Sequence, residues 1–254
     1  MPTRLVNLVI DAADPAALAR FWSEALGWPI TYEEPDEVVV EPSEDDESQR
    51  GQLPLIFVRV DDAKTVKNRV HLDLASRSDA DQAALVARLE GLGARKLDIG
   101  QGPDVTWEVM ADPDGNEFCV VSHAGSVGAD PASAFGSLWP VAAVVLDSPD
   151  PDAIAPFWSG ATSWPIGGRD GTHVWLREPT ANGPYLDIRR NDDPKTTKLR
   201  VHLDVAPYPD DDQALETARL ESLGARRIDI GQGDVTWHVL TDPQSNEFCN
   251  LSPR

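Results

Sequence analysis

The chain has 254 residues, of which 41% are hydrophobic and 26% charged, a composition typical of a folded globular protein. Asp and Glu outnumber Lys and Arg by 43 to 22, giving a net charge of −21, so the chain lacks the basic surface that nucleic acids and anionic membranes require. No segment approaches the ~18 consecutive apolar residues of a transmembrane helix. The N-terminus lacks the apolar core of a signal peptide, so we expect a cytoplasmic protein.

The first 60 residues predict one strand, one helix and three further strands. The segment RLVNLVIDA at 4–12 has the apolar pattern of a strand. Asp14 followed by Pro15 is typical of a helix N-cap and first helical position, and Gly27 stands where a left-handed glycine ends a helix. Three short strands are then expected at 29–33, 37–41 and 53–60.

The same order of elements returns in the next 60 residues. RVHLDLA at 69–75 predicts a strand, and 79–92 predicts a helix that ends in the sequence LGA. Three more strands are expected at 95–99, 104–111 and 116–122. A β-α-β-β-β unit therefore occurs twice in the first half of the chain.

The second half of the chain repeats the first half. LEGLGARKLDIGQG at 89–102 returns as LESLGARRIDIGQG at 220–233, with 11 of 14 positions identical. A period of this length indicates duplicated domains rather than a solenoid of short units. We therefore expect an α+β protein with two tandem domains of paired βαβββ modules, at 1–122 and 138–254, joined by a linker rich in Gly, Ala and Ser at 123–137.

The two cysteines of the chain are equivalent. Cys119 and Cys249 both lie in the phrase NEFC, once in each copy. The chain has no CxxC pair and too few cysteines for a disulfide framework, so we expect two reduced, buried thiols.

Four segments of the first copy carry a family resemblance: DPAALARFWSEALGW, KNRVHLDL, ARLEGLGA and MADPDGNEFCVV. Together with their counterparts in the second copy, they resemble the vicinal oxygen chelate superfamily, which includes glyoxalase I, extradiol dioxygenases and bleomycin-resistance proteins. The resemblance implies paired βαβββ modules that form a curled sheet around a cleft, and an intramolecular pseudo-dimer of the two domains in a monomeric chain. In metal-using members, a divalent ion in this cleft chelates neighbouring oxygens of the substrate.

The resemblance also implies where a metal would bind. Metal-using members take a His from the fifth strand and a Glu from the eighth strand. His71 and Glu117 match these positions in the first domain, and His202 and Glu247 match them in the second. Glu117 is then also the candidate catalytic base.

The other two ligand positions of the family lack a strong ligand here. The first-strand position is Asn7 in the first domain and Ala143 in the second, and Asn is a weak ligand for a transition metal. The fourth-strand position falls near Leu55 and near 185–186, with Asp187 one residue away. Neither domain therefore offers a closed set of His, His and Glu.

Strand alternation groups the polar candidates by face. His71 and Asp73 share one face of RVHLDL, and Glu117 and Cys119 share one face of NEFCV. Without a metal, His71 would hydrogen-bond Glu117 inside the cleft as a satisfied buried pair.

Three functions stay open on this sequence. The first is a metal-free protein that binds a small molecule in a domain-one cleft lined by Asn7, His71, Trp107 and Glu117, where Trp107 or its counterpart Trp237 stacks on the ligand. The alternative is a divalent-metal-dependent lyase, isomerase or dioxygenase. The third is a chain in which one domain only completes the pocket of the other. The expected partner is a small molecule in each case, and the one cofactor considered is a divalent metal ion.

Overall fold

The computed structural model describes residues 3–43, 45–46, 49–102, 105–122, 140–178 and 183–254, so the expected linker at 123–137 lies outside the described residues. The described elements form four successive βαβββ modules, as the sequence predicts. The first module is β1 (Arg4–Ala12), α1 (Pro15–Leu26), β2 (Ile30–Glu34), β3 (Glu37–Val40) and β4 (Leu55–Arg59). The second is β5 (Val70–Ala75), α2 (Asp79–Leu92), β6 (Arg95–Lys96), β7 (Trp107–Ala111) and β8 (Glu117–Val121). The third is β9 (Val141–Ser148), α3 (Pro151–Thr162), β10 (Ile166–Arg169), β11 (His173–Leu176) and β12 (Tyr185–Arg190). The fourth is β13 (Val201–Ala206), α4 (Gln213–Ser222), β14 (Arg226–Arg227), β15 (His238–Thr241) and β16 (Glu247–Asn250).

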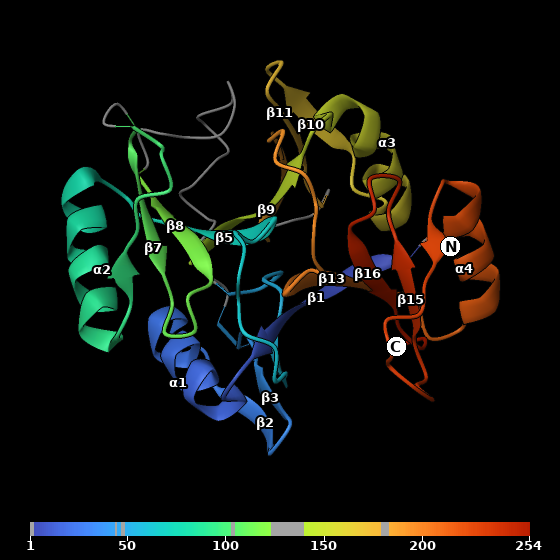
Figure 1. Cartoon of the computed structure of the whole chain (residues 1–254), viewed down its shortest axis with the longest axis horizontal. Coiled ribbons are helices and arrows are strands. Elements are labelled where there is room, and N and C mark those ends of the chain that lie inside the picture. Colours follow the sequence, from blue (N-terminus) through green and yellow to red (C-terminus); the bar gives the residue numbers. More distant parts are fainter. Residues whose placement is uncertain (1–2, 44, 47–48, 103–104, 123–139, 179–182) are drawn as a thin grey trace.

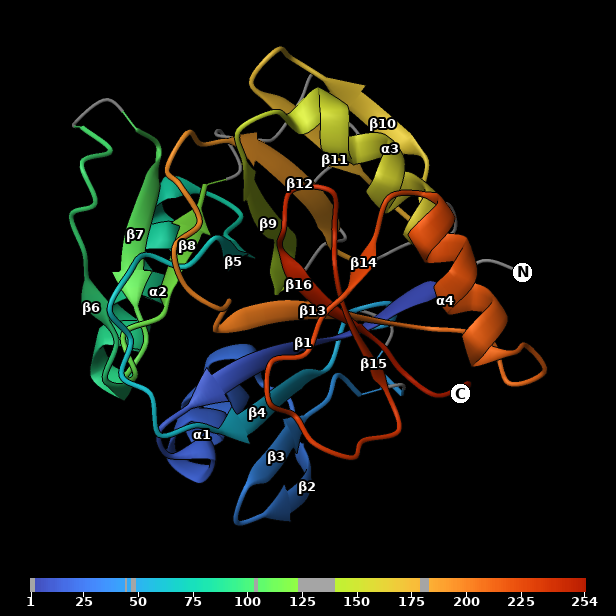
Figure 2. The ribbon, with the colours of Figure 1, turned by 45° about the vertical axis from the view of Figure 1, so that its right-hand side comes forward.

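Each of the two sheets contains strands from both copies of the repeat (Figure 1). Sheet A has the order β14-β15-β16-β13-β1-β4-β3-β2, and sheet B has the order β10-β11-β12-β9-β5-β8-β7-β6. The first module therefore shares a sheet with the fourth, and the second shares a sheet with the third. At the centre of each sheet, first strands pair antiparallel, β1 with β13 and β5 with β9. The four helices lie at the outside of the molecule around these central strands (Figure 2).

Alternation along the strands gives each sheet two different sides. Leu8 and Ile10 of β1 and Leu72 of β5 belong to the large hydrophobic core that the helices cover. The opposite sides carry only small apolar clusters together with buried polar residues. We call these sides face A, which carries Asn7 in sheet A, and face B, which carries His71 in sheet B.

The first helix of each copy begins with the capping signal that the sequence contains. The side chain of Asp14 accepts a hydrogen bond from the backbone N–H of Ala17 at 3.0 Å, and Asp150 does the same for Ala153 at 3.1 Å. Gly27 ends α1 in the left-handed conformation, with a φ of 71°. The predicted helix signals are therefore confirmed.

A tryptophan in each copy ties the first module to the second. The indole N–H of Trp22 on α1 donates to Asp112 in the turn before β8 at 3.2 Å, and Trp158 on α3 donates to Asp242 at the same distance. Because these two modules lie in different sheets, the pair holds the two sheets of one copy against the shared core.

One further expectation is met by the described residues. Cys119 and Cys249 are free and buried, as predicted. In the described part of the chain, no helix combines the length and the apolar character needed to cross a bilayer.

The end of α3 generates a stability prediction. Ser163 occupies the left-handed region, with a φ of 62°, at the place where α1 has Gly27. A left-handed backbone is unfavourable for a residue with a Cβ, so Ser163→Gly should raise the free energy of unfolding by about 0.5–1 kcal/mol in urea titrations. The reverse change Gly27→Ser should lower it by a similar amount, and a loss of stability in Ser163→Gly would contradict this account.

Candidate functional site

Face B carries a chain of charged side chains that runs across three strands. On β5 and β8, one nitrogen of His71, one oxygen of Asp73 and the sulfur of Cys119 lie within 4.8 Å of one another. On β12, Arg189 donates to Asp73 Oδ2 at 2.7 Å and to Asp187 Oδ2 at 2.6 Å. His71 Nε2 lies 3.4 Å from Asp73 Oδ1. The buried guanidinium thus stands between two buried carboxylates.

The charges of face B stabilise one another. Burial opposes ionisation of Asp73, but the Arg189 charge and the contact with His71 outweigh it and hold the pKa of Asp73 well below its usual range. Burial also disfavours the charged form of Arg189, but Asp73 and Asp187 outweigh it and raise the pKa of the guanidinium. Burial raises the pKa of the Cys119 thiol, and the Asp73 charge adds to this effect. Face B is therefore an ionised network with its own internal cation.

Face A carries the same three donor types without the arginine. His202, Asp204 and Cys249 form the second cluster whose donor atoms lie within 4.8 Å of one another. His202 Nε2 lies 3.5 Å from Asp204 Oδ1 and 3.6 Å from Cys249 Sγ. Asn7 Nδ2 on the neighbouring strand β1 donates to Asp204 Oδ2 at 2.7 Å.

The groups of face A are driven to their neutral forms. Burial raises the pKa of Asp204 to about 7, although the hydrogen bonds from Asn7 and Cys249 oppose this shift. Burial lowers the pKa of His202 to about 3, and Lys198 adds to this effect. Burial also raises the pKa of the Cys249 thiol. The imidazole of His202 is therefore neutral at pH 7, the form that binds metals.

Two pairs of equivalent positions explain the difference between the faces. The strand register aligns Val58 with Asp11 in sheet A and Arg189 with Asp147 in sheet B. Because Asp11 and Asp147 are equivalent in the repeat, Val58 occupies in sheet A the position that Arg189 occupies in sheet B. Asn7 lies opposite Asp204, whereas Ala143 lies opposite Asp73. At one pair of positions, face A has the amide of Asn7 and face B has the methyl group of Ala143. At the other pair, face A has the alkyl group of Val58 and face B has the guanidinium of Arg189.

The structure groups the expected site residues differently from the expected domain-one cleft. Asn7 lies on face A beside Asp204, and His71 lies on face B, because β1 pairs with β13 rather than with β5. Asp187 lies on face B, where its Oδ1 is 3.6 Å from His173 Nδ1.

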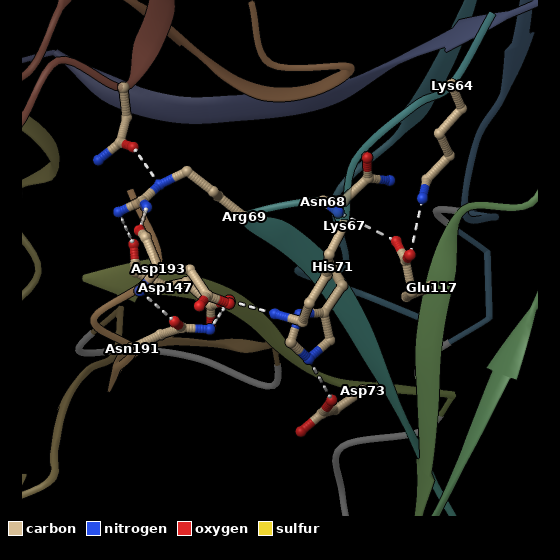
Figure 3. Close-up of polar contacts among 11 residues, drawn as sticks. Lys64, Lys67, Asn68, Arg69, His71, Asp73, Glu117, Asp147, Asn191 and Asp193 are labelled. Carbon is tan, nitrogen blue, oxygen red and sulfur yellow. Dashed lines mark hydrogen bonds and ion pairs between the residues drawn. The ribbon is translucent and has the colours of Figure 1, made fainter. Parts of the chain in front are cut away.

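Glu117 and Glu247 are each bound by a lysine and a backbone N–H. Glu117 Oε1 accepts from Lys64 at 2.6 Å and Oε2 accepts from the backbone N–H of Asn68 at 3.1 Å, while His71 turns toward Asp73 (Figure 3). Glu247 repeats this arrangement with Lys195 at 2.7 Å and the N–H of Leu199 at 3.2 Å. The hydrogen bond expected between His71 and Glu117 is replaced by these ion pairs, and the metal-binding and catalytic roles of the two glutamates stay predictions.

The two expected stacking residues differ in environment. Trp107 is partly buried and packs against the small apolar cluster of face B that contains Val109 and Cys119. Trp237 is 38% exposed and lies just before β15. Trp107 therefore lies at an apolar part of face B, and the roles of Trp107 and Trp237 in ligand binding both stay predictions.

A cavity of about 690 Å³ lies between the loop at 61–69 and its repeat counterpart at 192–200. Its charged residues bind one another. Lys67 and Asn191 both donate to Asp147, and Lys198 donates to Asp11 at 2.5 Å (Figure 3 shows the Asp147 side). The contacts of Asp147 join the segments beside β5 and β12 to β9 within sheet B, and the contact of Asp11 joins the segment before β13 to β1 within sheet A. We therefore assign these charged residues a structural role.

Comparison with known proteins agrees with this architecture. The family model of the glyoxalase-like domain matches residues 7–121 and 143–251. The chain belongs to the glyoxalase-like domain family. No curated protein matches the sequence.

Solved structures show the same fold at low identity. Glyoxalase I from Zea mays superposes with a TM-score of 0.65 at 12% identity, covering 98% of this chain and 92% of that chain. A candidate dioxygenase from Bacillus subtilis subsp. subtilis str. 168 superposes with a TM-score of 0.63 at 15% identity, covering 99% and 85%. Two glyoxalase-like segments in one chain fit an intramolecular pseudo-dimer.

Strand alternation alone points to two donors beside the family positions. Asp73 and Cys119 lie two residues beyond His71 and Glu117, on the faces that strand alternation assigns to them. Arg189 could not be assigned to this site from the sequence, because nothing in the pattern shows that β12 and β5 share a sheet.

The raised pKa of Asp204 generates a pH prediction for the metal-free protein. The pKa rises from 3.8 to about 7 on folding, so the folded state retains a proton that the unfolded state releases. The contribution of this proton to the free energy of unfolding is complete below the ordinary pKa of 3.8 and is lost as the pH rises through 7. In urea unfolding with a chelator present, the wild type should lose about 2–4 kcal/mol more than Asp204→Asn between pH 4 and pH 8.

Asp73→Asn is the matched control for this measurement. The pKa of Asp73 is lowered on folding. Its contribution to the free energy of unfolding is therefore present above the ordinary pKa and is lost only as the pH falls below that value. A wild-type profile that runs parallel to that of Asp204→Asn would contradict the assignment.

Proposed function

We propose that this protein binds a divalent cation on face A and uses it to hold a small molecule that carries neighbouring oxygens. The observation that carries the proposal is Asp204 Oδ1, a buried oxygen without a hydrogen-bond partner among the described residues. It lies in a cluster with His202 Nε2 and Cys249 Sγ. Imidazole nitrogen, carboxylate oxygen and thiolate sulfur are the donors that Zn²⁺ and similar transition metals take in proteins.

Each residue of face A has a distinct part in this proposal. His202, Asp204 and Cys249 are the ligands. Asn7 is a positioning residue, because its amide donates to Asp204 Oδ2 and leaves Oδ1 turned toward His202. When bound, a divalent cation polarises a carbonyl or hydroxyl oxygen of the small molecule.

The local charge supports a cation at this place. Among the described residues, neither lysine nor arginine hydrogen-bonds Asp204, and Lys198 is engaged by Asp11 at 2.5 Å. Arg254 and Lys198 act on the cluster at longer range. A buried carboxyl group and a buried thiol without a nearby positive charge are costly to ionise, and a divalent ion offsets this cost.

The proposal includes the wider setting of the protein. We assign it to the cytoplasm, where buried free thiols such as Cys249 stay reduced, and to a monomer whose two copies form the pseudo-dimer. Lyase, isomerase and dioxygenase chemistry all suit a ligand with neighbouring oxygens on a metal.

A metal titration with matched variants tests the proposal. Protein purified with a chelator and titrated with Co²⁺ should bind one ion per chain and develop the absorption of a cobalt–thiolate bond. His202→Ala should weaken binding by at least about tenfold, because it removes one of few ligands, and Cys249→Ser should abolish the thiolate absorption. The repeat supplies the controls, since His71→Ala and Cys119→Ser should leave both readings unchanged.

The opposite pattern would place the metal elsewhere. Loss of binding in His71→Ala rather than His202→Ala would reject face A, and a wild type that binds no ion would reject the proposal entirely. Asn7→Ala should weaken binding by about tenfold without altering the thiolate absorption, because Asn7 acts through Asp204.

A further inference from the structure

The two faces present one donor set in two electrostatic settings. Face B has His71, Asp73 and Cys119 where face A has His202, Asp204 and Cys249. Asp73 Oδ1, like Asp204 Oδ1, has no hydrogen-bond partner among the described residues. By its donors alone, face B would fit a divalent ion as well as face A.

Face B nevertheless does not fit a metal, because Arg189 already supplies the positive charge. The guanidinium donates to Asp73 Oδ2 at 2.7 Å and to Asp187 Oδ2 at 2.6 Å, and its side chain is only 18% exposed. A divalent ion on the other oxygen of Asp73 would stand within a few ångströms of this cation in a poorly solvated place. The repulsion between like charges is large under those conditions.

We propose that Arg189 is a built-in cation that takes the place of a divalent ion on face B and keeps metal out of this face. Asp73 and Asp187 hold the guanidinium from two sides, so its charge is fixed beside Asp73. Planar guanidinium N–H groups bind carboxylates in a directed way.

The proposal differs from a purely structural role for Arg189. Removal of a purely structural ion pair would only lower the free energy of unfolding. Removal of a cation that keeps metal out should in addition create a metal site on face B. The inference takes the proposed metal site of face A as its reference, but Co²⁺ binding on face B is measured independently of that site.

The test is made in a His202→Ala background, which removes a ligand from face A. In this background, Arg189→Val, which copies Val58 of the equivalent position, should gain Co²⁺ binding by at least tenfold, with a cobalt–thiolate absorption that Cys119→Ser abolishes. Arg189→Lys keeps the charge and should gain nothing. Equilibrium dialysis and absorption spectroscopy supply the readings, and thermal unfolding shows which variants fold.

A second variant guards against misfolding from two unpaired carboxylates. Asp187→Ile with Arg189→Val copies both Ile56 and Val58 of sheet A and leaves Asp73 as the carboxylate of the cluster. It should gain the same binding. A folded variant of either kind that binds no Co²⁺ more tightly than its parent overturns the proposal, as does equal binding by Arg189→Lys.

The reciprocal change separates this inference from the proposed function. In the otherwise wild-type chain, Val58→Arg should weaken Co²⁺ binding on face A by at least tenfold, and Val58→Gln, of similar length without charge, should not. If the wild type binds no ion but Arg189→Val does, the proposed function fails and Arg189 remains a built-in cation. If the wild type binds on face A and no Arg189 variant gains a site, the proposed function stands and the inference on Arg189 fails.

Discussion

The antiparallel pairing of β1 with β13 and of β5 with β9 is the constraint on which the rest of the structure depends. It joins a module of one copy to a module of the other copy in each sheet. Asn7 reaches Asp204 through the first pairing, and the second, with β12 beside β9, brings Arg189 to Asp73. The hydrogen bonds of Asp204 and of Asp73 are thus each shared between the two halves of the chain.

Changes at two pairs of equivalent positions give the two faces different chemistry. The imidazole, carboxyl and thiol groups are the same, yet the carboxyl of Asp73 is ionised beside Arg189, whereas the pKa of Asp204 beside Asn7 is raised to about 7. Duplication within one chain allows this division, because each copy can diverge at positions such as Val58 and Arg189 while the sheet geometry is kept. Two identical subunits would place the same residues on both faces.

The sequence predicts the local structure well and the partners of each strand poorly. Asp14, Pro15 and Gly27 define α1 through local backbone chemistry, and alternation assigns His71 and Asp73 to one face, so these predictions are confirmed. Alternation cannot choose between residues two positions apart, and the choice of Glu117 over Cys119 as a donor rests on the family resemblance alone. Nor can it show which modules share a sheet, since pairing within a copy and pairing between copies satisfy the same pattern.

The pairing between copies also governs how the chain acquires its structure. Asn7 and Asp204 are 197 positions apart, so sheet A is completed only when the fourth module meets the first. Contacts at such separation slow folding, because a long loop must close before they form. A lone copy would present the edges of β1 and β5 without their partners, and such edges invite strand addition from another molecule. Joining both copies in one chain gives each strand edge a partner at high effective concentration, so the edges pair within the chain rather than with another molecule.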